Sequence, residues 1–267
     1  MFVKSLIGRA RRAALARWQQ RKLPLHNSAP IVTFTFDDFP RSAYEAGGGI
    51  LRSHEAHGTY YAAMSLEGKV NHQGEHFLRS DLERLLADGH DLGSHTYSHI
   101  SSRTSPAETF RADAERGKRA LEPWCEAGGA RHFAYPYGEI SFSAKGRVGS
   151  MMESCRGITP GIMTDFADLN MLPANSIYAH DFDPLLIERV LARAGKLRGW
   201  TIFYTHDVRE NPSEFGCTPQ QLEFAVRQAV QVAGARVLTI SEAIASFKSN
   251  QLAVPAERVA DRFSHAS

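Results

Sequence analysis

The chain has 267 residues, of which 43% are hydrophobic and 22% are charged, which is enough apolar material for a sizeable core. No apolar run approaches the roughly 18 residues that a membrane span needs. The three cysteines are widely spaced and form no CxxC pair, so we expect neither a cysteine metal site nor a disulfide framework. This cysteine usage fits a reducing compartment.

The basic residues are concentrated at the start of the chain. Residues 1–36 hold seven Lys or Arg and no acid, whereas the rest holds 24 basic and 29 acidic residues. The body shows no interleaved aromatic and basic residues of the kind that bind nucleic acid, so we expect no nucleic-acid partner.

Residues 1–28 are expected to form a basic amphipathic N-terminal helix. Val3, Ile7, Ala10, Ala14 and Trp18 recur at helical spacing. Arginines interrupt the apolar stretches, so the segment lacks the apolar region of a signal peptide. Two interpretations stay open. In the first, residues 1–23 lie on an anionic membrane surface. In the second, the helix packs on the body or is disordered. We therefore predict a cytoplasmic protein, peripheral on the inner face of the membrane under the first interpretation.

Residues 29–248 are predicted to form one α/β domain. Strand-like and helix-like segments alternate along it, and the expected strands lie at 31–36, 59–64, 90–95, 132–138, 156–160, 176–182, 200–206 and 236–240. About seven β-then-α units imply a parallel sheet with crossover helices, which can close into a barrel. Residues 249–267 are expected to be a C-terminal tail.

Ionisable or turn-forming residues follow four of the expected strands. They are Asp37 and Asp38, His95 and His99, the segment "YPYG", and His206 with Asp207. If the sheet closes into a barrel, these residues converge at the carboxyl ends of the strands, where such folds place function.

A divalent metal would explain the adjacent carboxylates Asp37 and Asp38. His95 and His99 are four apart, so in a helical turn they share a face. Two imidazoles and one carboxylate suit zinc. One Asp can then ligate the cation while the other stays close as a base. His72 and His76 have the same spacing but lie in a polar loop, and we assign them no role.

The segments "TFTFDDFP", "SHTYSH", "FAYPYG" and "FYTHD", in this order, resemble the polysaccharide deacetylases of carbohydrate esterase family four, the nodulation-factor deacetylase homology group. The resemblance runs from about residue 31 to 240. It implies a distorted (β/α) barrel and a divalent metal, usually Zn²⁺ and sometimes Co²⁺. It also implies hydrolysis of N-acetyl groups on amino sugars.

The resemblance assigns roles to the residues that match the motifs. Asp37 matches the general base, and Asp38, His95 and His99 match the metal ligands.

Further matches concern the substrate. Tyr137 matches the residue whose backbone N–H helps to hold the oxyanion, and His206 matches the acid that protonates the leaving amine. Pro136, Tyr137 and Tyr204 are expected to contact the substrate. Tyr204 stands where the family has a leucine that lines the acetyl pocket. Either Tyr204 alters which acyl group fits, or it points away and Phe203 or a neighbour fills the pocket.

Two departures from the family pattern concern the base. Ala134 stands where the family often has an arginine that braces the catalytic Asp. Asp165 and Asp168 lie where the family supplies that arginine with a partner, but without the surrounding pattern. Something else must therefore orient Asp37, or catalysis is slower.

The expected function is a metal-dependent hydrolase that removes N-acetyl groups from acetamido sugars of a surface polysaccharide or its lipid-linked precursor, as in exopolysaccharide biosynthesis. The alternatives are a deformylase or deacylase of a lipid-linked amino sugar, a peptidoglycan deacetylase, and an inactive barrel that only binds glycan. The inactive barrel is disfavoured because Asp37, Asp38, His95, His99 and His206 are all present.

Overall fold

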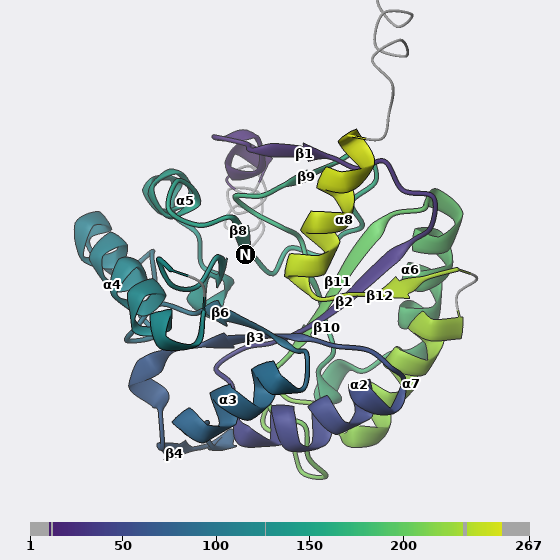
Figure 1. Ribbon diagram of the computed structural model, residues 1–267, viewed down its shortest axis with the longest axis horizontal. Helices are drawn as coiled ribbons and strands as arrows, with labels where there is room; N and C mark the ends of the chain where they lie inside the picture. The colour runs from purple at the N-terminus through teal and green to yellow at the C-terminus, as the bar shows by residue number, and fades with distance from the viewer. Residues whose placement is uncertain (1–10, 12, 126, 232–233, 253–267) are drawn as a thin grey trace, which may run out of the picture.

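The computed structural model describes residues 11, 13–125, 127–231 and 234–252. A parallel sheet forms its centre (Figure 1), with the hydrogen-bonded order β10, β11, β2, β3, β6, β7, β8 and with β12 also paired to β2. The strands are β2 (Ile31–Phe36), β3 (Thr59–Ala62), β6 (Asp91–Ser94), β7 (His132–Ala134), β8 (Ser154–Arg156), β10 (Asn175–Ser176), β11 (Trp200–Thr205) and β12 (Arg236–Val237). The predicted α/β fold is confirmed.

The barrel is distorted around β2. One side of β2 pairs with β11 along its whole length. The other side is shared, because β12 pairs with its first two residues and β3 with its last two. The hydrogen-bonded path ends at β8 and β10, so the sheet is a half-barrel.

Helices cover the outside of the sheet (Figure 1). In α7 the buried residues Leu222, Ala225, Val226 and Ala229 follow helical spacing and face the core. None of the described helices is both long and apolar enough to cross a bilayer. The helical elements are η1 (Ala43–Gly48), α2 (Gly49–Ser53), η2 (Met64–Leu66), α3 (Arg79–Ala87), α4 (Ala107–Ala120), η3 (Glu122–Trp124), η4 (Pro136–Gly138), α5 (Phe142–Gly149), η5 (Ala179–Asp181), α6 (Pro184–Leu197), α7 (Pro219–Gln231) and α8 (Ile240–Leu252).

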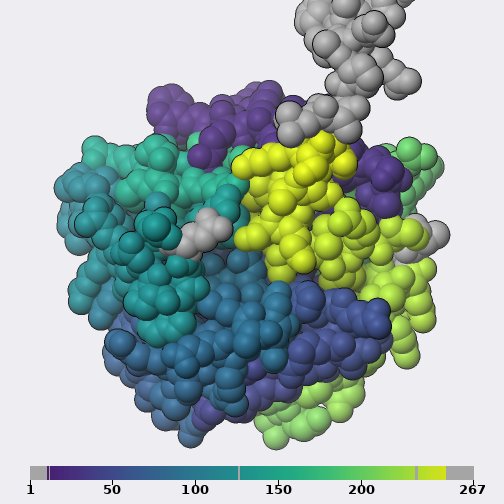
Figure 2. All heavy atoms as spheres, viewed as in Figure 1, coloured from purple at the N-terminus to yellow at the C-terminus, as the bar shows by residue number. Residues whose placement is uncertain are grey.

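The described part of the N-terminal segment packs on the body. β1 (Lys22–Pro24) pairs antiparallel with β9 (Phe166–Asp168), and Leu15 is buried in a cluster with residues of β7 and α5. Figure 2 shows α8 in yellow lying against the purple N-terminal residues. These contacts agree with the interpretation of a packed helix and give no support to membrane contact. Residues 1–10, 12 and 253–267 lie outside the described residues, and the domain boundaries stay a prediction.

Candidate active site

Asp37 and Asp38 directly follow β2, at the carboxyl end of the sheet. Their exposed fractions are 4% and 6%, so both carboxylates are buried. The backbone N–H of Asp37 donates to the carbonyl of Thr205 in β11, which fixes the strand end. Asp38 then adopts a left-handed conformation with φ 60°. Backbone strain of this kind in a non-glycine residue is typical of functional sites.

His95 follows β6 and faces Asp38 with its Nε2 atom. Its Nδ1 lies 2.8 Å from the carbonyl oxygen of Ala134 in β7. A carbonyl only accepts hydrogen bonds, so Nδ1 carries a proton. Burial lowers the pKa of His95 to about 4, so at neutral pH the ring is uncharged and Nε2 keeps its lone pair. Nε2 lies 3.5 Å from Asp38 Oδ1.

His99 reaches the same carboxylate oxygen. Its Nε2 lies 2.9 Å from Asp38 Oδ1, and its ring centroid is 5.0 Å from that of His95. The expected helical turn between the two histidines is wrong. The segment is irregular, and Thr96 and His99 have φ of 59° and 54°. This turn, rather than helical spacing, brings the two rings together.

The side chains of Asp38, His95 and His99 fit a divalent cation. Their ligand atoms all lie within 4.8 Å of one another. Two imidazole nitrogens and one carboxylate oxygen are a donor set that zinc accepts in catalytic sites, with a position left for water. The carbonyl that holds His95 orients it as outer partners orient metal-binding histidines. Burial raises the pKa of Asp38. The hydrogen bond and the charge of His99 nevertheless hold this pKa well below its usual range.

Arg156, at the end of β8, forms an ion pair with Asp37. Both side chains are buried, and Nη2 of the guanidinium donates to Asp37 Oδ1. Burial raises the pKa of Asp37, but the charge and hydrogen bond of Arg156, together with the nearby imidazoles of His95 and His206, hold this pKa below its ordinary value. Position 134 holds no arginine, so the sequence left open what orients Asp37. Arg156 is a residue that contacts Asp37 directly.

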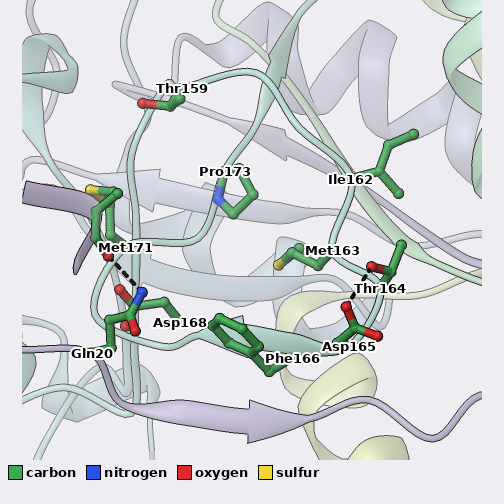
Figure 3. A pocket seen from close by; sticks show the side chains of 11 residues that line it. Gln20, Thr159, Ile162, Met163, Thr164, Asp165, Phe166, Asp168, Met171 and Pro173 are labelled. Atoms are coloured by element: carbon green, nitrogen blue, oxygen red, sulfur yellow. Dashed lines mark hydrogen bonds between the residues drawn. The ribbon is translucent and has the colours of Figure 1, made fainter. Parts of the chain in front are cut away.

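Asp165 and Asp168 line a different hollow, of about 340 Å³, beside the N-terminal segment (Figure 3). Asp168 accepts a hydrogen bond from the backbone N–H of Arg21 and lies 2.7 Å from Lys145 Nζ. Asp165 lies by Thr164 near the same hollow. Both carboxylates thus belong to the surroundings of the N-terminal segment, and within the described residues neither forms a hydrogen bond or an ion pair with Arg156.

The candidate site opens into a cavity of about 450 Å³. Its lining brings together most of the residues expected from the sequence and several that were not. It comprises Asp37, Asp38, Leu66, Asn71, His72, Gln73, His99, Tyr137, Gly138, Ile158, Tyr178, Tyr204, His206 and Phe215. His95 lies behind this lining, against Asp38.

His206 and Tyr137 flank the carboxylates. His206 Nδ1 donates to the carbonyl of Phe215 at 3.0 Å, and its Nε2 lies 4.0 Å from Asp38 Oδ2, so Nε2 faces the site. Tyr137 has φ 60°, so its backbone is left-handed like those of Asp38 and His99. Its hydroxyl lies 3.1 Å from His99 Nδ1.

The substrate contacts predicted from the sequence divide into two groups. Tyr137 and Tyr204 line the cavity, whereas Pro136 is buried at the start of η4 and is not part of the lining. Because Tyr204 lines the cavity, the geometry agrees with the interpretation in which Tyr204 faces the acyl group and does not point away. Phe203 belongs to the core cluster on the other face of the sheet.

A hairpin in the polar loop that holds His72 and His76 reaches Asp38. It consists of β4 (Val70–Asn71) and β5 (Gly74–Glu75). Gln73 Nε2 donates to Asp38 Oδ2 at 2.9 Å, and His76 Nδ1 donates to the Asp38 carbonyl at 3.1 Å. Arg209 holds the hairpin through the carbonyl of His72. Because β4 and β5 are two residues each, no periodicity in the sequence signals them.

Known proteins similar to this chain are polysaccharide deacetylases and a related carbohydrate esterase. Residues 26–150 match the model of the polysaccharide deacetylase family. A chitooligosaccharide deacetylase of Azorhizobium caulinodans is 31% identical over 111 residues, which are 41% of this chain and 49% of that protein. A peptidoglycan-N-acetylglucosamine deacetylase of Bacillus cereus is 29% identical over 99 residues, 37% of this chain and 43% of the relative. The matches thus span about half the length of these relatives.

The solved structures extend the likeness of the fold beyond residue 150. A family 4 acetyl xylan esterase from Clostridium thermocellum, solved in complex with a cobalt ion, superposes with a TM-score of 0.53 at 19% identity. The superposition covers 84% of this chain and 93% of the esterase. β8, which ends at Arg156, and β11, which His206 follows, therefore belong to the same distorted barrel as the matched segment.

Proposed function

We propose that this chain is a metal-dependent deacetylase that removes N-acetyl groups from acetamido sugars of a surface polysaccharide or its lipid-linked precursor. The proposal rests on two sets of groups that meet at one cavity. The metal-ligand set of Asp38, His95 and His99 lies beside the carboxylate of Asp37 and the imidazole of His206. Curated relatives named for deacetylation of chitooligosaccharide and peptidoglycan support it.

The side chains can divide the work of amide hydrolysis between them. The divalent ion, when bound, supplies a Lewis acid for the amide carbonyl and the attacking water. Asp37, whose pKa Arg156 helps to keep below its ordinary value, accepts the proton of that water. The backbone N–H of Tyr137 donates to the developing oxyanion, and such a donor typically contributes about 3–4 kcal/mol. His206 gives a proton to the nitrogen, because the amine cannot leave as an anion.

Zn²⁺ is the proposed ion, with Co²⁺ as the alternative. Zinc binds imidazole nitrogen and carboxylate oxygen without a geometric demand of its own. The acetyl xylan esterase of similar fold was solved with cobalt, which supports the alternative.

A second candidate is a deacylase for a smaller group, such as formyl on a lipid-linked amino sugar. The observation that favours it is Tyr204, whose ring lies in the cavity at the position of the family's leucine. The tyrosine side chain is larger than a leucine side chain and leaves less room for the methyl group of an acetyl substrate. Peptidoglycan is a third substrate class, supported by the name of the Bacillus cereus relative.

The test is acyl release from short N-acetylglucosamine oligomers, from their N-formyl counterparts and from peptidoglycan, with and without chelator. The proposal expects acetate from the N-acetyl oligomers, abolished by chelator and restored by Zn²⁺. Faster release of formate would favour the second candidate, and release only from peptidoglycan the third. Cell fractionation tests the predicted cytoplasmic location separately, and protein in the periplasm or medium would contradict it.

A further inference from the structure

Two departures from the family pattern, Ala134 and Tyr204, meet at Arg156. Ala134, in β7, stands where the family often has its bracing arginine. Arg156 lies on the next strand, β8, and is the register partner of Ala134. Register partners on neighbouring parallel strands point to the same face of the sheet. The guanidinium therefore reaches Asp37 from one strand further along the sheet.

The buried guanidinium of Arg156 needs more than one partner, because burial of an unpaired charge is costly. Nη2 donates to Asp37, and Nη1 donates to the carbonyl of Gly157 at 3.1 Å. The guanidinium carbon also lies 5.3 Å from the ring centroid of Tyr61 and 4.9 Å from that of Tyr204. Aromatic rings at these distances attract a guanidinium through their π faces.

Tyr204 supplies something that a leucine at this position lacks. Leucine has no π face and no quadrupole with which to stabilise a cation. The ring of Tyr204 is itself held, since it packs edge-on against Tyr178 at 5.5 Å between centroids. The change at position 204 therefore follows from the place of the guanidinium and not only from the shape of the acyl pocket.

We propose that Arg156 and Tyr204 form a relocated brace for Asp37 that takes the place of an arginine at position 134. Both are positioning residues. Arg156 fixes the orientation of the Asp37 carboxylate, and Tyr204 fixes Arg156. The catalytic side of this proposal rests on the proposed role of Asp37 as the base, whereas the ion pair itself does not.

The main test moves the arginine back to β7. Arg156→Ala should lower kcat about 10–100-fold with little change in KM, as loss of an outer partner commonly does. It should also lower the melting temperature of the metal-free protein, because Asp37 is left buried and unpaired. The double variant Ala134→Arg/Arg156→Ala should recover a large part of the lost kcat and of the lost melting temperature. The control Ala134→Met/Arg156→Ala fills space without a charge and should recover neither.

A second set of variants tests Tyr204. Tyr204→Leu should lower kcat more than Tyr204→Phe does, because phenylalanine keeps the ring. In the Ala134→Arg/Arg156→Ala background, Tyr204→Leu should lower kcat by a clearly smaller factor than it does in the wild type. An equal loss in both backgrounds, with a changed preference between formyl and acetyl substrates, would mean that Tyr204 acts on the acyl group alone, and it would overturn its part in the brace.

The outcomes separate the brace from the proposed function. If the wild type releases no acyl group but the melting temperatures follow the order above, the brace is supported and the proposed function fails. If the wild type is active but Ala134→Arg/Arg156→Ala recovers neither kcat nor melting temperature relative to its methionine control, the brace is overturned.

Discussion

The guanidinium of Arg156 is paired with the carboxylate of Asp37, 119 positions earlier in the chain, and both groups are buried. Arg156 ends β8 and Asp37 follows β2, so two strands that are not neighbours in the sheet each contribute one partner. Asp38, next to Asp37, faces two histidines instead. The adjacent carboxylates thus have different partners, which suits one for proton transfer and the other for a metal.

The first prediction concerns pH. Burial raises the pKa of Asp37, and Arg156, His95 and His206 together more than offset it, so this pKa lies below its ordinary value. Arg156→Ala removes the largest of the lowering effects and leaves only those of His95 and His206, so the pKa of Asp37 should rise. Because activity needs ionised Asp37, the acidic limb of kcat/KM should move to higher pH in this variant. An acidic limb at the wild-type pH would contradict the role of Arg156.

The same shift has a consequence for stability. A carboxylate whose pKa is lower in the folded state stabilises the fold above its unfolded pKa, and this contribution is lost as pH falls through the folded value. The ordinary value for Asp37 is 3.8. The gap in melting temperature between metal-free wild type and Arg156→Ala should therefore be full at neutral pH and should narrow as pH falls below that value. Thermal unfolding across pH measures it, and a constant gap would argue against the ion pair.

A second prediction tests His206 as the acid. His206→Ala should slow hydrolysis of an N-acetyl sugar about 100-fold or more, as loss of general acid catalysis does. An activated acetyl ester with a nitrophenolate leaving group needs no proton, so its hydrolysis should slow much less. Equal losses on the amide and the ester would show that His206 does something other than protonate the leaving group.

A third prediction concerns the hairpin residue Gln73. Its amide donates to Oδ2 of Asp38, and an outer partner of a metal-ligating carboxylate typically contributes about 10–100-fold in metal affinity. Gln73→Leu should raise the Kd for Zn²⁺ by about that factor in competition with a chromogenic chelator. Lys69→Ala, at an exposed residue just before β4, is the matched control. A Kd equal to that of the control would remove Gln73 from the site.

A fourth prediction concerns the N-terminal segment. Lys145 is fully buried, donates to the carbonyl of Leu15 at 2.8 Å and pairs with Asp168 at 2.7 Å. Removing one member of a buried pair typically costs about 3–5 kcal/mol. Lys145→Met should therefore lower the free energy of unfolding in urea by about that amount, while Lys196→Met on the exposed face of α6 should change it by about 0.5 kcal/mol or less. Similar values for the two variants would show that the segment does not depend on this contact.

The sheet and the strand-end residues could be predicted because each signal is local. β2 and β11 are six-residue apolar strands, and the motif residues follow them directly. Arg156 could not be predicted in this way. The expected strand at 156–160 put Arg156 at its beginning, whereas β8 ends there, and only the end of the strand faces the site. β8 is three residues long, so its bounds depend on pairing with β7 rather than on periodicity.

The hairpin around Gln73 was missed for a similar reason. Arg209, 137 positions away, contacts the hairpin by donating to the carbonyl of His72. A polar loop of this kind carries no periodic pattern, and its place over the site is decided by tertiary contacts alone. The spacing of His95 and His99 suggested a helical turn, but the positive φ of Thr96 and His99 forms a different turn that brings the same rings together.

The most direct test of the account is to measure metal content and acetate release together in the wild type and in Asp37→Asn, both purified without chelator. The account predicts one bound Zn²⁺ or Co²⁺ per chain in each protein, and acetate release from an N-acetylglucosamine oligomer by the wild type alone. Loss of metal in Asp37→Asn would reverse the roles of Asp37 and Asp38. A wild type that binds no divalent metal would contradict the proposed active site as a whole.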